Sequence, residues 1–196
     1  MKSSIFRTLL VLGLLAVRLS SFAMNLAPDC ISLQSGGGMG IATVGTGWSY
    51  GKNKRFETEL FVGLIPKYDS SQAKAIITIK ENLVPWNMAL KERLFLEPLT
   101  VSIYFTSILN NKFWAKQPDR YPSGYYGLPT KIRTNIALGQ RLSYVPRKKL
   151  SFTESITAYY ELSTCDIYVA SAFGNKYIKP YNSLQICIGL KLNLIL

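Results

Sequence analysis

The chain ends on residues 184–196, LQICIGLKLNLIL, in which apolar and polar residues alternate almost without exception. Successive side chains of a β-strand point to opposite faces of the sheet, so this segment has one apolar face and one polar face. The same alternation runs through residues 132–144, IRTNIALGQRLSY. Together the two stretches favour an all-β protein built as a small barrel of strands.

Alternation interrupted by turn residues predicts eight antiparallel strands that run up and down around the barrel. Short links at residues 52–54 and 145–149 predict turns at one end, and long links at 109–129 and 163–181 predict loops at the other. The first strand then begins, and the last strand ends, on the turn side, which we expect to be periplasmic; this arrangement requires an even number of strands. The first strand is the shortest and the least regular of those predicted, which are 30–36, 39–51, 55–65, 73–83, 96–108, 130–144, 150–162 and 182–195.

The first residues have the layout of a secretory signal peptide. Lys2 and Arg7 form a basic end, residues 9–17 form an apolar stretch, and residues 21–23, SFA, form a small-x-small cleavage site. The apolar stretch is shorter than the roughly 20 residues that a membrane-spanning helix needs, which disfavours the alternative of a retained anchor. We therefore expect cleavage after Ala23, with residues 1–23 as the signal peptide and residues 24–196 as one outer-membrane β-barrel.

The composition points to a surface that contacts something other than water. Charged residues make up 17% of the 196 residues, against roughly 25% in ordinary soluble domains. The net charge is +12, of which Lys2, Arg7 and Arg18 leave with the predicted signal peptide. Export and the gathering of positive charges in turns argue against nucleic acid as the partner. We expect the partners to be outer-membrane lipid and lipopolysaccharide, with any surface ligand or protein partner left open.

Periodicity alone does not decide which face of the strands is turned outward, because a lipocalin-like barrel in water alternates in the same way. Two observations favour a transmembrane barrel. The polar faces consist of Gly, Ser, Thr, Asn and Tyr with isolated charges, as a packed lumen would. Aromatic residues gather beside the short turns, as in the girdle of a membrane barrel; these are Trp48, Tyr50, Phe56, Tyr144 and Phe152.

The same assignment of faces predicts a cluster of charged side chains in the lumen. An eight-stranded barrel is only just wide enough for its own side chains, so these groups should fill it as ion pairs. A structural plug is the simplest interpretation, and a polar pocket or proton-linked site built on the two neighbouring glutamates is the alternative. The predicted cluster consists of Glu57, Glu59, Lys80, Arg133, Arg141, Glu161 and Lys191.

The chain contains no histidine, and this argues against enzymatic activity. Serine hydrolases usually activate the nucleophile with an imidazole, whose pKa lies near neutrality. The commonest transition-metal ligand is also missing, and Cys30, Cys165 and Cys187 have irregular spacing. We therefore expect no catalytic residues, no metal and no cofactor, although one cysteine pair remains possible.

The two long predicted loops mix aromatic and basic residues. This combination suits contact with headgroup sugars and phosphates or with a ligand. The alternative is that the aromatic residues simply pack each loop over the barrel mouth. The candidate contact residues are Trp114, Lys116, Arg120, Tyr125, Tyr126, Lys176 and Lys179.

The whole mature chain resembles the small outer-membrane β-barrels of Gram-negative bacteria. More narrowly, residues 45–51, GTGWSYG, and residues 175–183 are similar to corresponding parts of the lipid A deacylase barrels. That resemblance implies removal of an acyl chain from lipopolysaccharide by a His-Ser site near the last strands. Serines such as Ser171 are present there but histidine is not, and the chain ends in Leu196 where such barrels have an aromatic residue.

These observations predict a non-enzymatic outer-membrane barrel with a filled lumen, acting as a structural protein or as a surface that binds lipopolysaccharide or another ligand. The first alternative is a deacylase-like hydrolase with an unconventional base. The second is a narrow channel, which a filled lumen disfavours.

Overall fold

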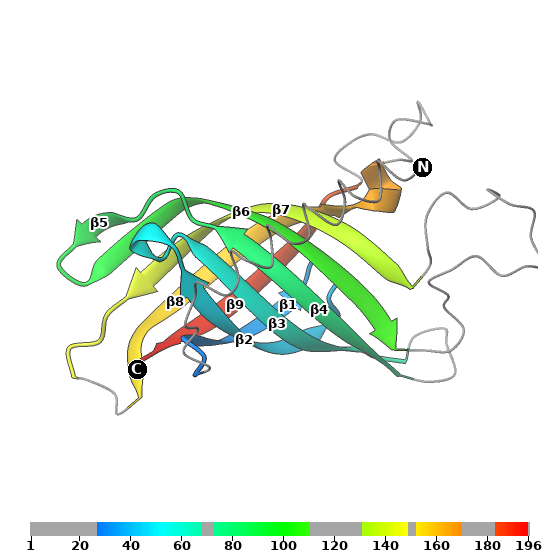
Figure 1. Ribbon diagram of the computed structural model, residues 1–196, viewed down its shortest axis with the longest axis horizontal. Coiled ribbons are helices and arrows are strands. Elements are labelled where there is room, and N and C mark those ends of the chain that lie inside the picture. The colour runs from blue at the N-terminus through cyan, green and yellow to red at the C-terminus, as the bar shows by residue number, and fades with distance from the viewer. Residues whose placement is uncertain (1–26, 68–72, 110–130, 149–151, 170–182, 196) are drawn as a thin grey trace, which may run out of the picture.

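The computed structural model describes residues 27–67, 73–109, 131–148, 152–169 and 183–195. The predicted signal peptide, residues 1–23, lies outside them. The described chain is almost entirely β-strand and forms an elongated barrel, with the C-terminus at the same end as the short turns (Figure 1). No helix among the described residues is long and apolar enough to cross a membrane.

Eight strands close into an antiparallel barrel, as the alternation predicted. Each strand pairs with its neighbour along the chain, β9 pairs with β1, and β4 pairs directly with β6 to complete the ring. The weakly patterned first strand is present with the predicted bounds and makes this closure possible. The barrel strands are β1 (Cys30–Gly36), β2 (Ala42–Tyr50), β3 (Phe56–Ile65), β4 (Lys74–Leu83), β6 (Leu94–Leu109), β7 (Ile132–Tyr144), β8 (Thr153–Cys165) and β9 (Gln185–Leu194).

A ninth strand, β5 (Met88–Lys91), lies outside the ring, and the sequence prediction omitted it. It pairs only with the first residues of β6, so the two form a hairpin that extends beyond the barrel at the turn end (Figure 1). Four residues are too few to show a period of two clearly, and Pro85 precedes them. The prediction therefore treated this stretch as a connection and began the next strand at Leu96 instead of Leu94.

The barrel is polar inside and apolar outside. Among the described residues, nineteen polar or charged side chains are buried, against nine that are apolar or aromatic. A soluble barrel with a greasy interior would show the reverse. Large apolar side chains instead cover the outer surface of all the barrel strands, including Leu33, Val44, Leu60, Val62, Ile77, Ile79, Ile103, Phe105, Ile136, Leu138, Leu162, Ile186, Ile188 and Leu190, each of which is at least 41% exposed.

The turn between β1 and β2 folds into the barrel and closes its loop end. Gly36, Gly37, Gly38 and Gly40 all have positive φ angles, between 64° and 115°, a region that favours glycine over residues with a Cβ. The turn carries Met39 inward, where it is fully buried in a cluster with other lumen residues, Phe61, Tyr104 and Ala137. The Tyr104 hydroxyl donates a hydrogen bond of 2.6 Å to the carbonyl of Gly37 and holds the turn in place.

Candidate functional site

The lumen contains a continuous network of charged side chains. Its most buried ion pair joins the Lys80 ammonium to both carboxylate oxygens of Glu161, at 2.7 and 2.6 Å. Both side chains are at most 1% exposed. Lys80 points inward from β4 and Glu161 from β8, so the pair crosses the lumen from wall to wall. A charge this far from water is stable only because its partner is held in direct contact.

A second group of charges lies nearer the turn end. Glu57 receives one contact from Arg141 at 2.6 Å and another from Lys191 at 2.7 Å. Lys191 also lies 3.2 Å from Glu59, so a single ammonium bridges the two glutamates of β3. Ser32 donates to one oxygen of Glu59 at 2.6 Å and Asn82 donates to the other at 2.7 Å. Every oxygen of Glu59 is therefore occupied by a neighbouring side chain.

Polar side chains connect the two groups into one network. The Asn82 amide that donates to Glu59 accepts a hydrogen bond of 2.7 Å from the Ser102 hydroxyl. Ser102 in turn lies 3.4 Å from Glu161. The charged and polar groups thus fill the barrel across its width, as the size of an eight-stranded ring requires.

The aromatic rings of two tyrosines lie next to the charged groups. The Lys80 ammonium lies 5.6 Å from the ring centre of Tyr159 and 5.9 Å from that of Tyr104. The Arg141 guanidinium lies 5.9 Å from the ring centre of Tyr159. Such distances allow a cation–π attraction. Tyr159 also donates a hydrogen bond of 3.0 Å to Gln34, which ties its position to β1.

Gly189 makes room for the Tyr159 ring, because a Cβ at this position would overlap the ring atoms. We therefore expect Gly189→Val to displace Tyr159 and to lower the free energy of unfolding by about 1–3 kcal/mol, as overpacking does. Urea titration of the folded protein in lipid vesicles measures this. Adding Tyr159→Leu to the Gly189→Val variant should recover part of the lost stability. If Gly189→Val leaves the free energy of unfolding unchanged, the close approach of Gly189 to the Tyr159 ring does not matter for stability.

Six of the seven predicted lumen residues meet in this network, and Arg133 does not. Arg133 lies on β7 eight residues before Arg141, roughly 26 Å away at about 3.3 Å per residue. It lies 4.0 Å from Asp166, at the loop end of the barrel. Alternation placed Arg133 on the correct face of the strand, but a shared face carries no information on depth along the barrel.

Glu97 belongs to the network, although sequence reasoning passed over it. Its carboxylate lies 3.7 Å from Arg141. In regular alternation Glu97 would share the outward face of Val101 and Ile103. A bulge between Glu97 and Thr100 adds one residue to β6 and shifts Glu97 to the inner face. Pro98, which has no N–H to offer a partner strand, is the one sequence signal that could have located it.

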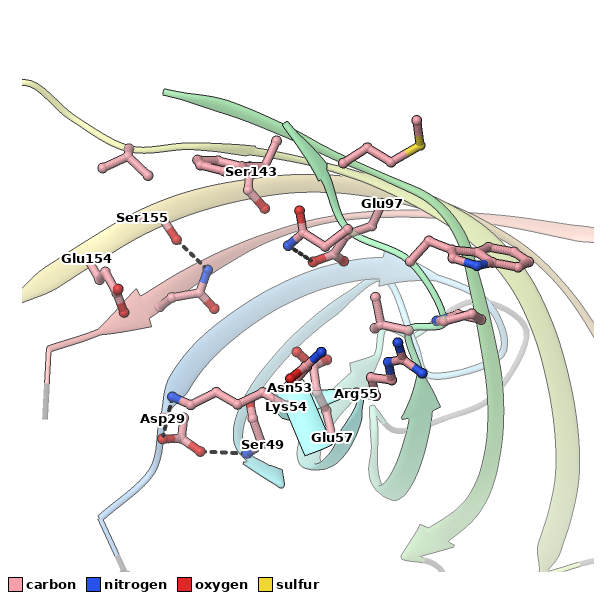
Figure 2. A pocket seen from close by; sticks show the side chains of 18 of the residues that line it. Asp29, Ser49, Asn53, Lys54, Arg55, Glu57, Glu97, Ser143, Glu154 and Ser155 are labelled. Atoms are coloured by element: carbon pink, nitrogen blue, oxygen red, sulfur yellow. Dashed lines mark hydrogen bonds and ion pairs between the residues drawn. The ribbon is translucent and has the colours of Figure 1, made fainter. Parts of the chain in front are cut away.

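A pocket of about 820 Å³ opens above the network at the turn end of the barrel (Figure 2). Glu57 and Glu97 contribute to its lining, so its floor is the charged network itself. Figure 2 shows Glu97 and Glu154 on different walls, with Arg55 on the same side as Glu57. The apolar part of the lining comes from the segment between β4 and β6 and from nearby residues, namely Val84, Pro85, Trp86, Met88, Phe95 and Val145.

The two neighbouring glutamates considered as a polar or proton-linked site are both bound by cations. Glu57 and Glu59 contact Arg141 and Lys191 at 2.6–3.2 Å. Among the described residues, no group of three or more Cys, Asp or Glu side chains is placed to hold a metal ion. The three cysteines are free thiols, two of them buried in the wall of the barrel.

The predicted loop contacts belong to segments outside the described residues. Residues 114, 116, 120, 125, 126, 176 and 179, and also Ser171, lie outside the described residues. Of the segments that resemble the deacylase barrels, residues 45–51 form most of β2 and its turn, and residues 175–182 are likewise outside the described part. Comparisons with protein-family models, with curated proteins and with solved structures found no match to this chain.

Proposed function

We propose that this chain is a non-enzymatic outer-membrane β-barrel whose filled lumen makes it a structural or ligand-binding surface protein. The observation that carries the proposal is the apolar outer surface of the ring, together with a charged interior. Soluble monomers rarely expose a continuous apolar patch larger than about 600 Å². A surface of this kind around all eight barrel strands is stable when hydrocarbon covers it.

Strand lengths fit a bilayer. β2, β3, β4 and β9 have 9 or 10 residues, close to the roughly 9–11 that a tilted strand needs to cross the hydrocarbon core. Aromatic side chains lie beside the turns, where Phe56, Tyr144 and Phe152 are at least 42% exposed. Tyr50 stacks on Phe56 with ring centres 5.9 Å apart. This position matches the interfacial girdle of membrane barrels.

The proposed orientation places the short turns, the start of β1 and the end of β9 in the periplasm. β1 begins and β9 ends side by side, and Leu194 N–H donates to the carbonyl of Asp29 at 2.8 Å. Long connections on the opposite side then face the exterior, as is usual for such barrels. The proposal includes the lipopolysaccharide contacts predicted from the sequence for Trp114, Lys116, Arg120, Tyr125 and the other loop residues.

Cell fractionation and migration in unboiled detergent gels test whether the protein is a barrel embedded in the outer membrane. Expressed with its N-terminal segment in a Gram-negative host, the protein should sediment with the outer membrane. It should also migrate differently before and after boiling, because a closed barrel resists detergent at room temperature. Recovery of the protein as a dissolved periplasmic monomer would contradict the proposal.

A filled lumen also predicts that the reconstituted protein carries no steady ionic current in planar bilayers. The Lys80–Glu161 pair and the Met39 cluster obstruct the path at two depths. Single-channel steps in proportion to the applied voltage would support the narrow-channel alternative.

Mass analysis of lipid A tests the absence of enzymatic activity. Cells with and without the protein should give the same lipid A species, because the chain has no histidine to activate a serine. Loss of an acyl chain only in cells that make the protein would establish the hydrolase alternative instead. The outcome is independent of the fractionation result, since a barrel can lie in the outer membrane with or without enzymatic activity.

A further inference from the structure

The pocket at the turn end has the dimensions and lining of a small-molecule site. Its volume of about 820 Å³ falls within the roughly 300–1,000 Å³ typical of such sites. It is a blind pocket, since the ion pair between Arg141 and Glu57 closes its floor. An exposed indole, Trp86, and the neighbouring Met88 give one wall an apolar character.

The charges around the pocket do not balance. Glu57 is paired from below with Arg141 and Lys191, and Asp29 lies 4.0 Å from Lys54 and accepts a hydrogen bond from the Ser49 N–H. Glu97, Glu154 and Arg55 remain, so the lining has one negative charge in excess. The network below does not compensate this charge, because lining and network together hold six carboxylates and five cations.

Glu97 is the least satisfied carboxylate of the network. Its one cationic neighbour within 4.0 Å among the described residues is Arg141, at 3.7 Å, and Arg141 contacts Glu57 more closely, at 2.6 Å. The Asn87 amide approaches the other oxygen of Glu97 only to 3.5 Å. One Glu97 oxygen is buried with no hydrogen-bond partner. Unpaired buried charge is unfavourable, so a cation at this point would be stabilised.

We propose that this pocket binds a small amphiphilic amine. The ammonium would lie against Glu97, with Glu154 contributing at longer range, and the apolar body would pack on Trp86 and Met88. The inference goes beyond the membrane proposal and does not depend on it, because the pocket is formed by the end of the barrel and the β5–β6 hairpin.

The test uses 2-phenylethylamine as the probe, with 2-phenylethanol as its neutral analogue and 3-phenylpropionate as its anionic analogue. The folded protein is held in zwitterionic nanodiscs, and the indole N–H signals of its three tryptophans are followed by NMR, with Trp86→Phe to assign the one in the pocket. We expect a saturable shift of the Trp86 signal with the amine, at least about fivefold weaker binding of the alcohol, and no saturation with the carboxylate.

Variants separate the pocket from general partitioning of the probe into lipid. Glu97→Gln should weaken amine binding about fivefold, whereas Glu92→Gln should leave it unchanged, because Glu92 lies exposed in the hairpin turn and outside the lining. If Glu97→Gln does not fold, Met88→Ala at an exposed position of the lining serves instead, with weaker binding expected and the Trp86 signal kept as the reporter. Equal affinity for amine and alcohol, preference for the carboxylate, or no saturable shift in the native protein would each overturn the proposal.

Discussion

Lys80→Met should destabilise the barrel by about 3–5 kcal/mol, the cost of removing one member of a buried ion pair. The substitution keeps the length and the apolar stem of the side chain but leaves Glu161 without the ammonium that contacts both of its oxygens. Glu161 is 1% exposed, so water cannot replace the lost partner. Urea titration of folding into phospholipid vesicles measures the change.

The double variant Lys80→Met with Glu161→Leu distinguishes the loss of pairing from a loss of packing. An apolar pair of similar volume removes both charges, and such replacements are often neutral or stabilising. The double variant should therefore recover most of the stability. Lys148→Met, at an exposed turn position, is the control and should stay within about 0.5 kcal/mol of the native protein. A single variant as stable as that control would show that the pair does not hold the lumen together.

The second large effect is expected on the outer surface. Leu190→Lys should cost about 2–4 kcal/mol, the penalty for a lysine at the middle of the bilayer on the lipid face of a barrel. Leu190 lies near the middle of β9 and is 51% exposed. In water, a lysine at a half-exposed surface position would cost little. Folding titrations into vesicles measure the difference.

Leu90→Lys is the matched control for this experiment. Leu90 is 50% exposed, almost the same as Leu190, but it lies on β5 in the hairpin outside the ring. The two positions differ in surroundings and not in exposure. We expect Leu90→Lys to change stability by no more than about 0.5 kcal/mol. Equal effects at both positions would mean that water, and not hydrocarbon, covers the outer face.

The ring of strands was predictable because the barrel strands alternate between apolar side chains on one face and mostly polar side chains on the other. The pattern in residues 184–196 depends only on the period of two, and β9 occupies most of that stretch. The weak strand β1 could be predicted from an independent requirement, since the first strand begins and the last strand ends on the same side of the barrel only when the strand number is even. Hairpin strand β5 satisfies neither condition, because it is short and lies outside the ring.

The sequence predicted which residues belong to the charged network, but not which of them contact each other. The period-two alternation predicted that Glu59 and Lys80 point into the lumen. These residues lie opposite each other on β3 and β4. Which partners meet depends on the register between strands and on the shear of the barrel, which no single strand encodes. Lys80 thus pairs with Glu161 across the lumen at 2.6 Å. One bulge at Pro98 was enough to conceal Glu97.

The most direct test of the account is whether hydrocarbon touches the outer face of the barrel. A nitroxide attached at Ile79→Cys, near the middle of β4 and 48% exposed, is compared with one at Leu90→Cys, which is 50% exposed, both with Cys165→Ser in phospholipid vesicles. We predict that the label at position 79 collides often with oxygen and rarely with a water-soluble nickel chelate, while the label at position 90 collides readily with the chelate. Equal access of the chelate to both labels would contradict the account.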